Sequence, residues 1–143
     1  MQDDLRNELG KMDNIVPRHS VLLFVESRYK VNRKLIKKTV LETLKQQKVE
    51  TPVEVSVAVV GDRKMHKLNK QYRGLDKTTN VLSFSLHEGE AVVLSDIEKK
   101  RLGDVVISYP QVISDAARDD VLVDEKVDEL ISHGVLHLLG VHH

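Results

Sequence analysis

The feature that most restricts the fold of this 143-residue chain is the spacing of the histidines near its C-terminal end. His133 and His137 are four residues apart, Gly140 follows them, and His143 is the last residue. If residues 124–139 form a helix, the two imidazoles project from the same side, one turn apart. A glycine just past a helix end commonly adopts the left-handed conformation and reverses the chain. The spacing therefore predicts a final helix and a turn that returns His143 toward the histidine pair.

Histidines with this spacing are typical zinc ligands. Their offsets of i, i+4 and i+10, with glycine at i+7, equal the ligand spacing of the metzincin proteases. We predict that His133, His137 and His143 bind one Zn²⁺ and leave its fourth position open. The protease general base is absent, because Gly134 stands where that signature has glutamate, and a glycine in mid-helix indicates close packing or access for a substrate. His142 is a weaker candidate, either a substitute ligand or a residue facing solvent.

Composition narrows the functional classes. The chain has no cysteine, which excludes disulfides, thiolate metal sites and a cysteine nucleophile. Its 22 Lys and Arg balance 22 Asp and Glu, so any basic surface for nucleic acid must be local. No apolar run approaches the roughly 20 residues needed to cross a membrane. No stacking platform for single-stranded nucleic acid stands out among the few aromatic residues. These are Phe24, Tyr29, Tyr72, Phe84 and Tyr109.

The chain length favours one domain preceded by a polar leader. Residues 1–20 contain four acidic side chains, so they fit neither a secretory signal, which needs an apolar core, nor a transit peptide, which is poor in acids. We expect a partly disordered leader over 1–20 and a single domain over 21–143.

Hydrophobic periodicity divides the rest of the chain into strands and helices. Short apolar or alternating runs predict strands, and apolar residues recurring every three to four positions predict helices. Four strands with helices between and after them favour an α/β or α+β domain with a mixed sheet, whose C-terminal helix carries the histidine pair. We expect strands at residues 21–25, 53–60, 80–86 and 102–108, helices at 32–47, 62–72, from 109 onward and at 124–139, and a surface loop from His87 to Arg101.

The predicted helix over 62–72 has two different sides. Gly61 and Asp62 are expected to supply a turn and an N-cap. Met65, Leu68 and Tyr72 would form the buried side. The opposite side carries the three cations that we call the basic stripe: Arg63, Lys67 and Lys70. Taken alone, such a stripe is best interpreted as a solvated helix face.

Three stretches of the sequence, in the same order along the chain, resemble the YbeY-type endoribonucleases, which are bacterial rRNA maturation factors. One is the histidine string from His133 to His143, and another is Leu102–Ser108. The remaining stretch comprises Leu68, Asn69, Tyr72, Arg73, Asp76 and Thr79 to Phe84. The resemblance spans most of residues 21–143. It implies a single-domain metalloprotein that cuts single-stranded RNA in rRNA processing, notably at the 3′ end of the small-subunit rRNA, and acts in ribosome quality control.

The resemblance also implies roles for individual residues. His133, His137 and His143 would bind Zn²⁺, and Arg73 matches the family's functionally important arginine. We therefore expect His133 and Arg73 to be catalytic, with Arg73 holding a phosphate; from its position alone, Arg73 would be a surface or structural residue. Together with Arg73, the basic stripe would bind RNA phosphates. The expected partners are single-stranded RNA or rRNA and the small ribosomal subunit or its proteins, in the cytoplasm and without a membrane.

The sequence departs from the family at its end. Val141 and His142 stand where the family usually has Tyr-Asp, and the missing carboxylate would otherwise orient a neighbouring imidazole. The chain also stops at the third expected ligand, where family members usually continue, so we expect a truncated or unusually short terminus.

Several roles stay open from the sequence. Asn80 and Ser83 either donate hydrogen bonds at the cleft or have structural roles, and Asp104 either orients a ligand or satisfies the backbone at a strand start. No general base is identifiable, so either metal-bound hydroxide or the RNA 2′-hydroxyl attacks. Two alternative functions remain: a metzincin-like metallopeptidase, which needs a substitute for the missing glutamate, and a non-catalytic ribosome-associated factor with structural zinc.

Overall fold

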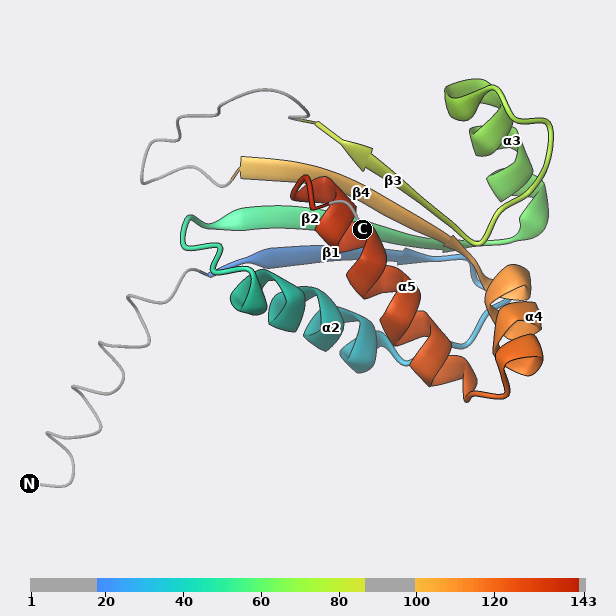
Figure 1. Ribbon diagram of the computed structural model, residues 1–143, viewed down its shortest axis with the longest axis horizontal. Helices are drawn as coiled ribbons and strands as arrows, with labels where there is room; N and C mark the ends of the chain where they lie inside the picture. The colour runs from blue at the N-terminus through green and yellow to red at the C-terminus, as the bar shows by residue number, and fades with distance from the viewer. Residues whose placement is uncertain (1–17, 87–99, 142–143) are drawn as a thin grey trace, which may run out of the picture.

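The structure is a computed structural model that describes residues 18–86 and 100–141. Most of the expected leader and of the expected surface loop lies outside these residues, as do His142 and His143. Four strands form one sheet, and four helices accompany it (Figure 1). The elements are β1 Ser20–Val25, α2 Arg33–Gln46, β2 Val53–Val60, α3 Asp62–Arg73, β3 Val81–Ser85, β4 Lys100–Ser108, α4 Tyr109–Asp119 and α5 Val123–Leu138. No helix within the described ranges is both long and apolar enough to cross a membrane.

The sheet is mixed, as predicted, with the strand order β1-β2-β4-β3. β1 and β4 run parallel to β2, whereas β3 is an edge strand antiparallel to β4. β4 begins at Lys100, inside the expected loop, because the N–H of Lys100 donates to the carbonyl of Pro52 and the Arg101 side chain pairs with Glu54 at 3.4 Å. Lys100 and Arg101 are the first two residues of the strand. Because charged residues are typical of loops, the sequence did not predict a strand here.

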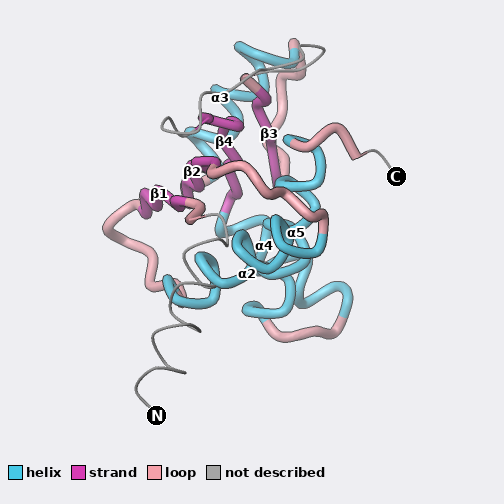
Figure 2. The backbone as a smooth tube through the Cα atoms, turned by 90° about the vertical axis from the view of Figure 1, so that its left-hand side faces the viewer, coloured by secondary structure: helices cyan, strands magenta, loops and turns pink. Residues whose placement is uncertain are grey.

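One face of the sheet is covered by α2, α4 and α5 (Figure 2). Alternate residues of each strand point to this face because the side-chain period of a strand is two. The apolar faces of α2 and α5 pack against them. Buried members of this core are Ile36, Val40, Leu44, Val55, Val57, Val59, Val105, Ile107, Val127, Ile131 and Val135.

On the opposite face, α3 is the one described helix, and it covers only part of the sheet (Figure 2). Met65 is fully buried there against Val60, Leu82 and Val106. The prediction that Tyr72 is buried is wrong, since 55% of its surface is exposed. Tyr72 stays exposed because no other helix in the described residues packs beside α3 on this face of the sheet.

The start of α3 also differs from the prediction. Gly61 is the N-cap residue, and no side chain caps the helix, so Asp62 is not the N-cap. Instead, the Asp62 carboxylate accepts hydrogen bonds that tie α3 to β4, to α4 and to the loop before β3. Burial, the largest influence, raises the pKa of Asp62, but the hydrogen bonds outweigh it and lower the pKa below its ordinary value. The donors are Ser108 at 2.8 Å, Thr78 at 3.0 Å and Gln111 at 3.1 Å.

Candidate metal centre

The position of α5 depends on Gly134. A Cβ placed on Gly134 would lie 2.6 Å from Cγ1 of Val105 in β4, closer than side chains pack. The prediction that this glycine serves close packing is thus confirmed. Because α5 packs against β4 at this residue, the contact fixes the distance between the sheet and the part of α5 that carries His133 and His137.

His133 and His137 face each other on α5. Their Nε2 atoms are 3.0 Å apart, and their ring centroids are 4.5 Å apart. His133 is exposed and His137 is half-buried. The two imidazoles therefore present one nitrogen each to the same point in space, as their spacing on a helix predicted.

The chain reverses after α5 as predicted. Gly140 has a φ of +78°, in the left-handed region, and its N–H donates to the carbonyl of His137 at 3.0 Å. The N–H of Val141 donates to the carbonyl of Leu136 at 2.9 Å. This pair of bonds is a Schellman motif. His143 lies outside the described residues, so its role as the third ligand stays a prediction.

The histidine pair fits a transition metal. Two nitrogens at zinc–nitrogen distances of about 2.05 Å, in tetrahedral geometry, lie about 3.3 Å apart, which is close to the separation in the structure. Neutral imidazoles are ordinary zinc ligands. Among the described residues, no group of three or more histidine, cysteine or carboxylate side chains is gathered for a metal, so a third ligand must come from elsewhere.

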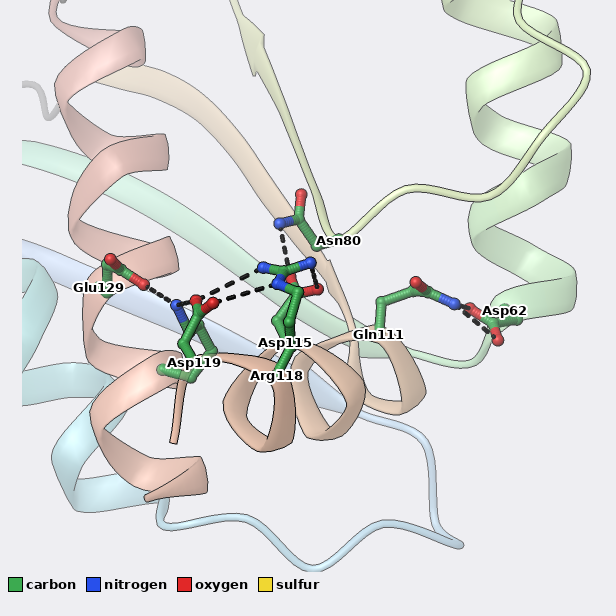
Figure 3. Close-up of polar contacts among 8 residues, drawn as sticks. Asp62, Asn80, Gln111, Asp115, Arg118, Asp119 and Glu129 are labelled. Atoms are coloured by element: carbon green, nitrogen blue, oxygen red, sulfur yellow. Dashed lines mark hydrogen bonds and ion pairs between the residues drawn. The ribbon is translucent and has the colours of Figure 1, made fainter. Parts of the chain in front are cut away.

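A charged network lies beside His133, in a hollow of about 590 Å³ between α4, α5 and the start of β3. Lys126 of α5 has only 8% of its side chain exposed, and its ammonium donates to Asp119 of α4 at 2.6 Å and to Glu129. Figure 3 shows Asp119 and Glu129 on their two helices. A hydrogen bond from Arg118, and then one from Lys126, lowers the pKa of Asp119 to about 2. The hydrogen bonds to Asp119 and Glu129 raise the pKa of Lys126.

The same network extends to β3. Arg118 pairs with Asp115 at 3.1 Å, and the side-chain amide of Asn80 donates to Asp115 at 2.8 Å (Figure 3). Asn80 therefore holds the start of β3 to α4. Sequence reasoning missed this network, whose local signals were the i, i+3 spacings of Asp115 with Arg118 and of Lys126 with Glu129.

Arg73 and the basic stripe lie on the other side of the sheet. The Arg73 guanidinium donates to the carbonyl of Ser83 in β3 at 2.6 Å and lies over the ring of Phe84, 5.1 Å from its centroid. α5 packs against β3 from the opposite face. The structure thus brings Arg73 to the same edge strand as the histidine helix. Arg63, Lys67 and Lys70 are exposed on α3, which lies on the opposite face of the sheet from α5 (Figure 2). Asp104 also belongs to the α3 side, where it lines a groove with Ser56 and Val106.

The fold and the site together define a class: a small α+β domain whose last helix presents two facing imidazoles beside a charged hollow. Residues 24–143 match the sequence pattern of the family described as Endoribonuclease YbeY. The chain belongs to the YbeY endoribonuclease family.

Individual relatives agree with this assignment. A protein of Roseiflexus castenholzii named Endoribonuclease YbeY is 37% identical over 79% of this chain and 71% of its own length. One of Desulforamulus reducens with the same name is 39% identical over 77% of this chain and 72% of its own length. The fold is similar to the solution structure of TM1509 from Thermotoga maritima, with a TM-score of 0.56 and 26% identity over 86% of this chain and 74% of that one.

Proposed function

We propose that this protein is a zinc-dependent endoribonuclease that cleaves single-stranded RNA during rRNA maturation in the cytoplasm. The observation that carries the proposal is the facing pair of imidazoles of His133 and His137 on α5, in a chain whose relatives are named endoribonucleases. The proposed substrate region is the 3′ end of the small-subunit rRNA, and the proposed partners are the small ribosomal subunit or its proteins. A role in ribosome quality control follows from the same family membership.

His133, His137 and His143 would hold the metal. When bound, a zinc ion with three neutral imidazole ligands and one open position supplies Lewis acidity and lowers the pKa of water to about 7. The chain adds a cation at a fixed place, since Arg73 is anchored by the carbonyl of Ser83 and by the ring of Phe84. A guanidinium held in this way binds a phosphate with two parallel hydrogen bonds and offsets negative charge that develops during cleavage.

The structure disfavours the peptidase alternative. A metzincin-type general base would have to replace Gly134, where even a Cβ meets Val105 at 2.6 Å. A carboxylate therefore has no room at that position without a shift of α5. We expect a peptide-library digest to show no cleavage.

Metal analysis combined with an RNA cleavage assay tests the proposal. We expect one zinc per chain in the wild type, cleavage of unpaired RNA, and loss of both in His137→Ala. Full activity in verified zinc-free protein would overturn zinc dependence. Zinc-loaded protein that binds the small subunit but leaves every RNA intact would instead support a non-catalytic factor.

A further inference from the structure

The sheet face that α3 leaves partly uncovered is a trough. The strand register places two rows of side chains across this face, with large residues on the edge strands and smaller ones on the central strands. One row is Leu22, Ser56, Asp104 and Phe84, and the other is Phe24, Ala58, Val106 and Leu82. The walls are about 14 Å apart, because three strand spacings of about 4.8 Å separate the edge strands. All of these residues except Leu82, which is buried, line a groove of about 610 Å³ together with Lys64, Leu68 and Tyr72 of α3.

Aromatic side chains line both walls of this trough. Phe24 on β1 is 59% exposed, and Tyr72 on α3 is 55% exposed. Phe84 on β3 meets Tyr72 edge to face, with ring centroids 5.3 Å apart. Three of the five aromatic residues of the chain therefore gather on one open face. No stacking platform stood out from the sequence, because these three residues lie far apart along the chain.

Cations adjoin the aromatic residues. Lys64 lines the trough and also an adjoining hollow of about 450 Å³, whose other cations are Arg28, Arg63 and Lys67. Glu26 is the acidic residue that lines this hollow in the described part of the chain, and it pairs with Arg28 at 3.0 Å. The charged residues in the described lining of the trough are Lys64 and Asp104. The exposed rings and Lys64, with the further cations of the adjoining hollow, complement the bases and phosphates of a nucleic acid rather than an apolar protein surface.

We propose that this trough binds single-stranded RNA, with bases stacked on Phe24 and Tyr72 and phosphates along Lys64, Arg63 and Lys67. The inference rests on the proposed function, since it takes RNA as the substrate. Single strands expose the flat faces of their bases, whereas duplexes hide them, so the trough selects unpaired RNA. A strand leaving the trough over the β3 edge passes Arg73 before it reaches the histidine pair on the other side of the sheet.

Fluorescence tests this contact directly, because the chain has no tryptophan and Phe24→Trp therefore creates a single tryptophan, which can be excited selectively over the three tyrosines. We expect a 2′-O-methyl single-stranded oligonucleotide to quench its emission, and a duplex of the same sequence to quench it at least about tenfold less effectively. The matched control is Leu122→Trp, at a residue that is 69% exposed before α5 and outside the trough, where we expect no quenching. Concentration-dependent quenching without any oligonucleotide would identify a second copy of the chain as the occupant and overturn the proposal.

Affinity measurements with the same 2′-O-methyl oligonucleotide, made with a chelator present so that no metal-bound hydroxide can cleave it, complete the test. Phe24→Ala should bind about tenfold more weakly, and Phe24→Tyr within about twofold of the wild type. An unchanged affinity in Phe24→Ala overturns the inference, even if the wild type cleaves RNA. If no RNA is cleaved by any form but Phe24→Ala still loses affinity, the proposed function fails and the trough stands as an RNA-binding site. Circular dichroism of each variant confirms that the fold is retained.

Discussion

Gly134 of α5 lies so close to Val105 of β4 that a single added methyl group would overlap the valine side chain. The contact lies between the two candidate ligands on α5, so it sets where the imidazoles of His133 and His137 stand relative to the sheet. This glycine therefore links core packing to the candidate metal centre, and its consequences can be measured.

We expect Gly134→Ala to lower the free energy of unfolding by about 1–2 kcal/mol. Overpacking costs about 1–3 kcal/mol, and the better helix propensity of alanine returns at most about 1 kcal/mol. Urea denaturation measures the change.

The double variant with Val105→Ala should lose less stability than the sum of the two single variants, because the smaller residue makes room for the added methyl. An additive double variant would contradict the packing role. Gly140→Ala serves as a control: it strains a left-handed residue with no neighbour within 4 Å, so Val105→Ala should not relieve it.

Acid should destabilise the protein through Asp119. Its pKa of about 2 lies below its ordinary value of 3.8, so the stability it contributes is complete above pH 3.8 and is lost as pH falls through about 2. Urea denaturation from pH 5 to pH 2 should show a decline in the wild type that is smaller in Asp119→Asn. The neighbouring Asp120→Asn keeps both ion pairs of Asp119 and should retain the wild-type decline. Identical pH profiles for the wild type and Asp119→Asn would refute this role.

Zinc should stabilise the folded chain. A ligand that binds only the native state adds about 2.7 kcal/mol when its free concentration is roughly 100 times Kd. We expect thermal unfolding to shift to higher temperature with added zinc and to return after chelation. His137→Ala should show neither change, whereas His66→Ala, which removes a histidine of α3 paired with Asp76, should keep both. A zinc response that survives in His137→Ala would remove α5 from the metal centre.

Replacement of Arg73 should separate catalysis from metal binding. We expect Arg73→Ala to lower kcat for RNA cleavage by about 100-fold to 1,000-fold, because one preorganised donor group to a developing charge is lost. Zinc content should not change, since Arg73 is not among the predicted ligands and its guanidinium is held by the carbonyl of Ser83 in the edge strand β3. Arg73→Lys should restore little, because an ammonium lacks the paired donors of a guanidinium. A variant with normal kcat would mean that Arg73 only tethers α3 to β3.

Much of the fold followed from local pattern. The alternation in β2 predicted a strand because side-chain direction repeats every two residues, and the structure has the same bounds, Val53–Val60. The predicted reversal at Gly140 is equally local, because a positive φ suits glycine. The predictions for Tyr72 and Asp62 failed, since both depend on which elements pack beside α3. The charged network at Lys126 was also missed, because its partners come from two helices and its burial is a property of their packing.

The sequence by itself determined the elements and the spacing that puts two histidines on one side of α5, because helix and strand periods act within a few residues. Only the tertiary structure decided which distant residues meet. Phe24, Tyr72 and Phe84 are separated by up to 60 positions, and strand register and the docking of α3 bring them to one trough. The same register places Arg73 and α5 on opposite faces of β3. Such juxtapositions depend on the strand order of the sheet, which no local repeat in the chain encodes.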